Sequence, residues 1–204
     1  MSLLARGLVA AAAVVCLGGH AHALPYSTPG VVNPVFSNFV AAESGDVTVY
    51  FAGSDAGYTS ELGLLVDGVP TGITGLNNHT SALGQAFNLG FAPVGASLTF
   101  FINVLTTGET YFTDPARNPD AVNHAYAEPF AGGTIGGSSS VFPAGTYIGF
   151  EDIGGGGDLD YNDVQFIFQN VAVPGPIAGA GLPALLGLAG AWFVRRRKQK
   201  RAAA

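Results

Sequence analysis

The sequence predicts an all-β fold for residues 24–173, a single antiparallel β-sandwich of the jelly-roll kind. Apolar and polar residues alternate in short runs, whereas the 3.6-residue period of amphipathic helices is nearly absent. Glycine and proline interrupt these runs at short intervals, and the chain contains 30 glycines and 12 prolines. The segment of about 150 residues is long enough for one domain with its own core. Many short strands in such a length are typical of two packed antiparallel sheets.

Alternation is clearest in the run SLTFFINV. Leu98, Phe100 and Ile102 share one face there, while Thr99 and Asn103 share the other. The runs DVTVYF and DVQFIFQN have the same two-residue period, which places every second side chain on one face of a strand. The strands expected from these patterns cover residues 35–41, 46–51, 62–67, 84–89, 97–104, 109–113, 122–128, 146–151 and 163–170.

Residues 1–23 have the pattern of a secretory signal peptide. Arg6 is the only charged residue before a long apolar run, and small residues at Ala21 and Ala23 form a cleavage site, so we expect cleavage after Ala23. The only cysteine, Cys16, lies in this leader. The mature chain is therefore expected to have no disulfide, no thiolate zinc site and no cysteine nucleophile.

The opposite terminus predicts a membrane-spanning helix over residues 177–194. This stretch is uncharged and apolar, and at about 1.5 Å per residue it makes a helix of roughly 27 Å, which just spans a hydrocarbon core. A basic cluster follows at residues 195–201. By the positive-inside rule this cluster stays in the cytoplasm, so residues 24–173 are expected to face outward.

Residues 174–204 combine a proline-rich motif, an apolar helix and a basic cluster. The stretch VPGPIAGAGLPALLGLAGAWFVRRRKQK resembles the PEP-CTERM protein-sorting signal of Gram-negative bacteria, with Gly175 where the most common form has Glu. The resemblance implies recognition by an exosortase, a transpeptidase-like membrane enzyme of bacteria that make exopolysaccharide. The chain would be anchored in the membrane first and then reach the cell surface or extracellular space. The expected processing motif consists of Val173, Pro174, Gly175 and Pro176.

Charge is distributed unevenly along the chain. All 14 acidic residues lie in residues 24–173, whereas Arg117 is the only one of the eight Lys and Arg residues in that segment. A nucleic-acid-binding surface needs cations that displace the counterions of phosphate, so this composition excludes nucleic acid as a partner. It favours a secreted domain that attracts cations.

The acidic charge is most concentrated in the stretch GFEDIGGGGDLDYNDVQF, between two expected strands. Its oxygen-bearing side chains are Glu151, Asp152, Asp158, Asp160, Asn162 and Asp163. Crowded carboxylates repel one another unless they protonate, extend into water or share a cation. The stretch is therefore either a solvated acidic turn or a cation site.

The spacing of Asp158, Asp160 and Asn162 is that of the first three ligands of an EF-hand loop, where oxygen donors at every second residue surround calcium. The rest of the loop departs from that pattern, because Asp163 and Gln169 stand where an EF-hand has Gly and Glu. The flanking segments are expected strands and not helices. Glycines next to the acids allow backbone carbonyls to approach an ion as well.

The segment FEDI followed by glycines and DLDYNDV resembles a domain of unknown function found in bacterial secreted and surface proteins. Its hallmark is an F-E-D turn that closes on D-x-D-Y-N-D. The resemblance implies a calcium-associated β-sandwich without assigned activity, and implies that the six oxygen-bearing side chains of the turn are Ca²⁺ ligands or supports of ligands. Asp55 and Glu61 are further candidates for positions near the same site.

No enzymatic activity is expected. The turn could supply a glycosidase acid and base in principle, but no set of Trp and Arg residues that would grip a sugar accompanies it. No G-x-S-x-G elbow is present. His79 and His124 stand alone in polar segments and are expected at the surface, without a metal-binding or catalytic role.

The sequence therefore predicts a non-catalytic exported protein of the cell surface or extracellular matrix, stabilised by calcium. The alternative is a calcium-dependent carbohydrate-binding module of the exopolysaccharide matrix, in which calcium bridges the protein and sugar hydroxyls. Tyr147 and Tyr161 could then stack on the sugar, although both are equally compatible with a core position.

Overall fold

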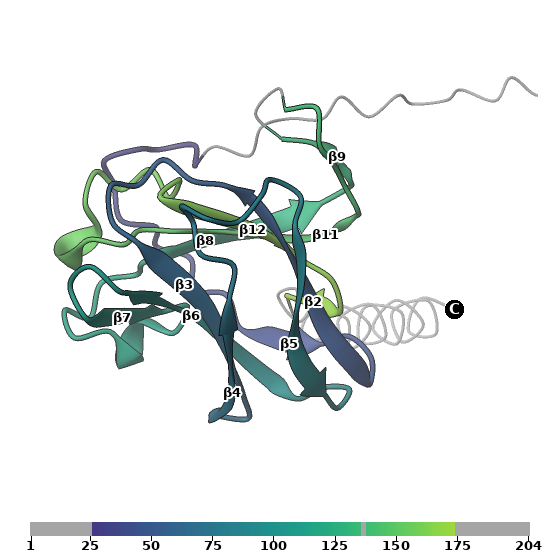
Figure 1. Cartoon of the computed structure of the whole chain (residues 1–204). Coiled ribbons are helices and arrows are strands. Elements are labelled where there is room, and N and C mark those ends of the chain that lie inside the picture. The colour runs from purple at the N-terminus through teal and green to yellow at the C-terminus, as the bar shows by residue number, and fades with distance from the viewer. Residues whose placement is uncertain (1–25, 136–137, 174–204) are drawn as a thin grey trace, which may run out of the picture.

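The computed structural model describes residues 26–135 and 138–173, which form an all-β domain with two large antiparallel sheets (Figure 1). This confirms the all-β prediction. The predicted signal peptide, and the sorting tail with its helix over residues 177–194 and its basic cluster, lie outside the described residues. Within the described ranges, no helix is long and apolar enough to cross a membrane.

The first sheet has the order β13–β1–β6–β3–β4, and β7 also pairs with β6. Its strands are β1 (Phe39–Ala41), β3 (Ser60–Val66), β4 (Val69–Gly75), β6 (Ser97–Val104), β7 (Glu109–Phe112) and β13 (Val171–Ala172). The bounds of β6 are those predicted, and its buried residues alternate with partly exposed ones as the SLTFFINV pattern predicts.

The second sheet has the order β5–β2–β12–β11–β8. Its strands are β2 (Gly45–Gly53), β5 (Ala86–Ala92), β8 (Ala125–Phe130), β11 (Gly145–Phe150) and β12 (Val164–Phe168). In the centre of this sheet, β11 and β12 pair antiparallel, with Phe150 opposite Val164. The acidic turn connects these two strands and contains the short 3-10 helix η2 (Gly154–Gly156).

One hydrophobic cluster contains side chains from both sheets. Phe100 of β6 and Phe168 of β12 lie in it with their ring centroids 4.2 Å apart. Both rings are fully buried, and burying a side chain of this size stabilises the fold by roughly 1.5–3 kcal/mol. The shared cluster therefore holds the two sheets together.

A second cluster covers the opposite face of the second sheet. It includes Ile167 of β12 and Phe142 of a small hairpin formed by β9 (Gly133–Thr134) and β10 (Val141–Phe142). The glycine- and serine-rich run AGGTIGGSSS, residues 131–140, predicts a flexible loop from its composition. That expectation is wrong at β9 and at the adjacent Ile135, because Ile135 is buried in the same cluster.

Several strand boundaries differ from the sequence prediction. Residues 35–38 precede β1 without pairing, and Val35 and Phe36 are exposed. β4 was not predicted, because Pro70 and two glycines interrupt it; an edge strand tolerates proline because one of its sides lacks a pairing partner. β8 begins later than predicted, because Asn123 donates its side-chain amide to the carbonyls of Asn33 and Val35.

Candidate metal centre

The acidic turn brings three of the six predicted ligands together. Glu151, Asp158 and Asp160 each offer a carboxylate oxygen, and these oxygens all lie within 4.8 Å of one another. Glu151 directly follows β11, and the other two precede β12. Because β11 and β12 are paired neighbours, the two ends of the turn meet where β11 ends and β12 begins. We call these three residues the carboxylate cluster.

The backbone of the turn adopts unusual conformations where the acids converge. Leu159 and Tyr161 both have φ of 58°, in the left-handed region that side chains other than glycine seldom adopt. Such strain persists where the surroundings fix the chain. The buried Tyr161 does this, since its hydroxyl donates to the Asn123 carbonyl at 2.9 Å and accepts from the Asn33 N–H at 2.8 Å.

Glu151 is the most unusual member of the cluster. Its side chain is fully buried, and its Oε1 accepts a hydrogen bond from the Tyr161 N–H. Its Oε2 is buried without any hydrogen-bond partner. Burial raises the pKa of Glu151 to about 8, and the charges of Asp163, Asp158 and Asp160 act in the same direction. A buried oxygen without a partner is costly and needs an explanation, for which a bound cation is one of the recognised candidates.

Asp158 and Asp160 form the outer side of the cluster. Asp158 is exposed, and Asp160 is half-buried. Asp160 accepts hydrogen bonds from both the backbone N–H and the side-chain amide of Asn162, at 3.1 and 2.6 Å. Burial raises the pKa of Asp160, and the charges of Asp158 and Asp55 raise it further. Asn162 therefore lies beside the cluster through its contacts with Asp160.

Asp152 and Asp163 form a separate buried pair next to the cluster. The Asp152 N–H donates to the Asp163 carboxylate at 2.9 Å, and the Ser60 hydroxyl donates to the Asp152 carboxylate at 3.2 Å. Burial raises the pKa of both, that of Asp163 to about 7. These two acids connect the turn to β3 and lie outside the group of three oxygens.

The two additional acids suggested by the sequence differ in position. The Asp55 N–H donates to the Asn162 carbonyl at 3.2 Å, and the Asp55 charge contributes to the raised pKa of Asp160. Asp55 therefore lies near the cluster as expected. In the described parts of the chain, Glu61 makes no hydrogen bond or ion pair with the carboxylate cluster.

His124 and Asp120 contact the backbone of the turn, and the sequence did not indicate these contacts. His124 was expected at the surface, but it is fully buried, with its ring stacked 3.8 Å from that of Tyr111. Its Nε2 lies 2.9 Å from Asp120, and its Nδ1 lies 3.1 Å from the Glu151 carbonyl. The prediction failed because the burial arises from strands distant in sequence. His79 is exposed, as predicted.

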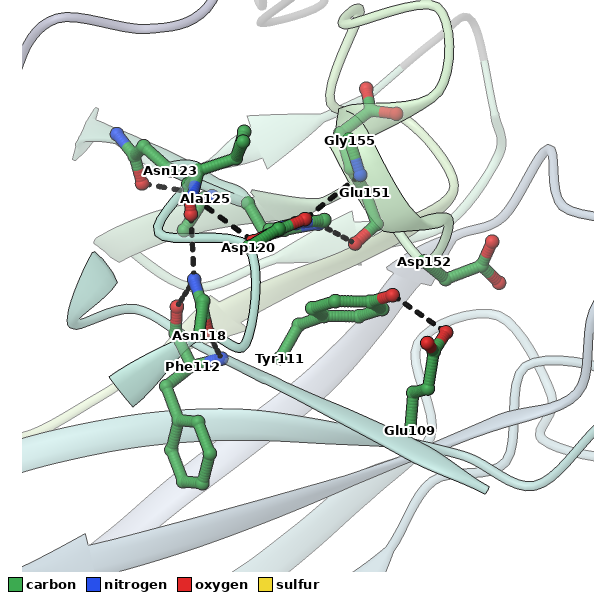
Figure 2. Close-up of polar contacts among 12 residues, drawn as sticks. Glu109, Tyr111, Phe112, Asn118, Asp120, Asn123, Ala125, Glu151, Asp152 and Gly155 are labelled. Atoms are coloured by element: carbon green, nitrogen blue, oxygen red, sulfur yellow. Dashed lines mark hydrogen bonds and ion pairs between the residues drawn. The ribbon is translucent and has the colours of Figure 1, made fainter. Parts of the chain in front are cut away.

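Asp120 is the charged anchor of the glycine-rich part of the turn. It accepts a hydrogen bond from the Gly155 N–H at 2.8 Å, and Figure 2 shows this contact beside Glu151 and Tyr111. Burial by itself raises the pKa of Asp120, but hydrogen bonds from Gly155, His124 and Val122 lower it to about 2. The carboxylate is therefore ionised at neutral pH and holds the start of the turn.

The two tyrosines that were considered as a sugar-stacking platform are core residues. Tyr147 and Tyr161 are both almost completely buried. The Tyr147 hydroxyl donates to Gln165 at 3.0 Å, and the Tyr161 ring packs edge-on against Tyr26, with centroids 4.8 Å apart. Neither ring face is available for stacking on a sugar.

Comparison with known proteins places the turn within a recognised family. No curated protein and no solved structure matches the chain. A family model described as a domain of unknown function, DUF4114, matches residues 55–170. The matched region contains the whole acidic turn and covers more than half of the chain. The chain therefore belongs to the DUF4114 family.

Proposed function

We propose that this chain is a non-catalytic exported protein of the cell surface or extracellular matrix whose β-sandwich domain, of jelly-roll type, binds Ca²⁺ in the acidic turn and is stabilised by it. The observation that carries the proposal is the unpartnered, fully buried Oε2 of Glu151 among the oxygens of Asp158 and Asp160. A cation there would both pair the buried oxygen and neutralise the repulsion between the three carboxylates.

The charges around the cluster support a cation. Among the described residues, Arg117 forms an ion pair with Asp114, and the His124 ring lies against Asp120. Neither pair places a basic side chain on Glu151, Asp158 or Asp160. The cluster is therefore a concentration of negative charge that the described side chains do not neutralise.

The chemistry of the donors favours calcium over other common metals. All three side chains offer carboxylate oxygens, the donors that hard cations prefer. Calcium takes six to eight oxygens in a flexible shell, whereas magnesium demands a smaller octahedral one. Asp158 is exposed, so water could complete the shell on that side. Asn162, Asp152 and Asp163 would then support the ligands from the positions described above.

The route of the chain to its destination belongs to the same proposal. The predicted signal peptide would export the domain, and the tail resembling a PEP-CTERM signal would anchor it in the membrane until an exosortase-type enzyme processes it. A carbohydrate-binding role is the second candidate, and the exposure of Asp158 is the observation in its favour, because sugar hydroxyls could reach the ion from that side. The burial of both tyrosines weighs against it.

Calcium titration of the full chain, followed by thermal unfolding, tests the proposal. A ligand that binds only the folded state at a hundredfold excess over its Kd stabilises it by about 2.7 kcal/mol, so the melting temperature should rise by several degrees. Magnesium should give a much smaller rise. The variant Asp114→Asn, which removes an acid outside the turn, should respond like the wild type, whereas Asp158→Asn should respond weakly.

An identical melt in calcium and in chelator would contradict calcium binding and leave a solvated acidic turn. Binding of exopolysaccharide fragments to the calcium-loaded chain, lost in chelator, would favour the carbohydrate-binding candidate over a purely structural role for the ion.

A further inference from the structure

The segment that precedes β1 lies across the acidic turn. We call residues 26–35 the N-terminal strap; Figure 1 draws it in purple beside the green turn. The Gly30 N–H lies within hydrogen-bond distance of the carbonyls of Asp158 and Leu159, at 3.0 and 3.3 Å. The Asn33 N–H donates to the Tyr161 hydroxyl at 2.8 Å. The strap thus contacts the turn at Leu159 and Tyr161, its two non-glycine residues with left-handed φ, and at the cluster member Asp158.

The strap is also anchored to the second sheet independently of the turn. The Asn33 side-chain amide donates to the carbonyl of Ala125, the first residue of β8, at 3.0 Å. The Asn123 side chain donates to the carbonyls of Asn33 and Val35, at 3.0 and 3.1 Å. Ala125 belongs to β8 and Asn123 lies two residues before it, so these contacts attach the strap to the end of a sheet strand.

The strap contacts converge on the groups that set the positions of the carboxylates. Asp158 belongs to the cluster, and its own carbonyl is an acceptor for the strap. Tyr161, whose hydroxyl is held by the strap and by Asn123, donates its N–H to the Glu151 carboxylate. The strap is therefore linked to two of the three cluster residues, to Asp158 through its backbone carbonyl and to the Glu151 carboxylate through Tyr161.

We infer that the N-terminal strap is a positioning element of the cation site, so that docking of the strap and binding of the cation favour each other. This inference rests on the proposed function. In the empty turn, the three crowded acids either repel one another or must keep a proton that the open turn would release, so they favour opening, while the strap contacts favour the closed arrangement. A cation favours the same closed arrangement. The coupling must be reciprocal, so calcium increases the equilibrium constant for strap docking by the same factor by which strap docking increases the calcium affinity.

The strap lies outside the region that the family model matches, which begins at residue 55. The inference therefore assigns part of the cation site to a segment that membership of the family does not cover.

The variant Tyr161→Phe tests the inference in the full chain. It keeps the ring in its packed position but removes the hydroxyl that joins Asn33 to Asn123. Calcium affinity measured by calorimetry should fall by roughly 5- to 150-fold, the range typical of coupled sites. Asn33→Ala, which removes the anchor to Ala125, should weaken binding in the same way. Tyr126→Phe is the matched control, since Tyr126 belongs to the same aromatic group but its hydroxyl faces Glu128.

Limited proteolysis provides a measurement that a general loss of stability does not reproduce. Calcium should slow cleavage within residues 26–35 of the wild type, and this protection should be reduced in Tyr161→Phe at matched calcium. Two results would overturn the inference but not the proposed function. The first is a calcium affinity that is equal in the wild type, Tyr161→Phe and Asn33→Ala. The second is a wild type that binds calcium but whose strap is cleaved at the same rate with and without it. A wild type that binds no calcium would overturn the proposed function and the inference with it.

Discussion

The two carboxylate oxygens of Glu151 lie in different environments. One of its oxygens accepts a backbone hydrogen bond, and the other is buried without a partner among further acids. Burial raises its pKa to about 8 from an ordinary value of 4.5. The ionised form of this side chain is therefore disfavoured in the empty turn and becomes favourable when a cation pairs with it.

The first prediction concerns pH. Between about pH 4.5 and pH 8 the unfolded chain has already released the Glu151 proton, whereas the metal-free folded chain retains it. The folded state then binds more protons, so its stability falls as the pH rises through this window. Calcium requires the ionised carboxylate, so calcium affinity should rise with pH up to about 8. Thermal melts in chelator and calcium titrations from pH 5 to pH 9 measure both effects.

The variant Glu151→Gln is the control for the pH prediction. It removes the titrating group, so its stability in chelator should depend less steeply on pH. A smaller dependence of the same sign should persist, because burial also raises the pKa of Asp163, to about 7. An unchanged slope in the variant would assign the pH dependence to other residues.

The second prediction concerns Gly157. This residue has φ of 55° and ψ of −124°, a combination that essentially only glycine adopts. A Cβ there would lie 3.0 Å from the unpaired Oε2 of Glu151, in the space next to that oxygen. Gly157→Ala should therefore lower the free energy of unfolding by about 1–3 kcal/mol and abolish the calcium response. Gly57→Ala is the control, because Gly57 has open space and no left-handed φ; thermal melts compare the two variants.

At the scale of the elements, the packing of the turn against β11 positions the cluster. Gly149 of β11 lies under the turn, and a Cβ on it would approach the Tyr161 carbonyl to 2.1 Å. That contact is with backbone, which cannot yield as a flexible side chain can. The absence of a side chain at this position of β11 therefore allows the turn to lie close to the strand.

The third prediction compares two substitutions on β11. Gly149→Ala should displace the turn, cost about 1–3 kcal/mol as overpacking does, and remove the calcium-dependent rise in melting temperature. Ile148→Val, at a fully buried core position, should cost about 0.5–1.5 kcal/mol but retain that rise. Thermal melts with and without calcium distinguish the two. A full calcium response in Gly149→Ala would contradict the role assigned to the packing of the turn on β11.

Sequence patterns predicted those elements whose two faces differ in burial. β6 alternates strictly, and its predicted bounds are the observed ones. β4 has no such pattern, because most of its residues are exposed on both faces of an edge strand. β13 consists of only two residues and is defined by its pairing with β1, which lies near the N-terminal end of the domain in the sequence. Such long-range pairing leaves no local trace in the sequence.

The candidate site was predictable in part for the same reason. The density of acids in one turn indicated the site, and the alternation of Asp158 and Asp160 indicated that both lie on one side. The separation of Asp152 and Asp163 from the cluster depends on Ser60 and on backbone geometry. The contacts of Asn33 with the turn, and of His124 with Glu151, join residues far apart in the sequence, so local patterns could not reveal them.

At the scale of the whole molecule, the fourth prediction concerns the tail. The motif from Val173 to Pro176 precedes the predicted membrane helix, so the exported protein should end near Pro174 after processing. Mass spectrometry of protein released from the cell surface measures this end. Finding residues 195–201 intact on most of the released protein would contradict processing by an exosortase-type enzyme.

The central claim is that a calcium ion occupies the carboxylate cluster, and Glu151→Gln tests it most directly. Asp160 is a less direct probe, because its oxygens also cap Asn162. In the variant, the neutral amide can donate to the neighbouring carboxylates but cannot bind calcium as the carboxylate does. Thermal unfolding of the full chain should give a variant that melts above the wild type in chelator and shows almost no rise with calcium. The account would be contradicted if calcium raised the melting temperature of the variant as much as that of the wild type. It would also be contradicted if the substitution lowered the melting temperature equally in calcium and in chelator.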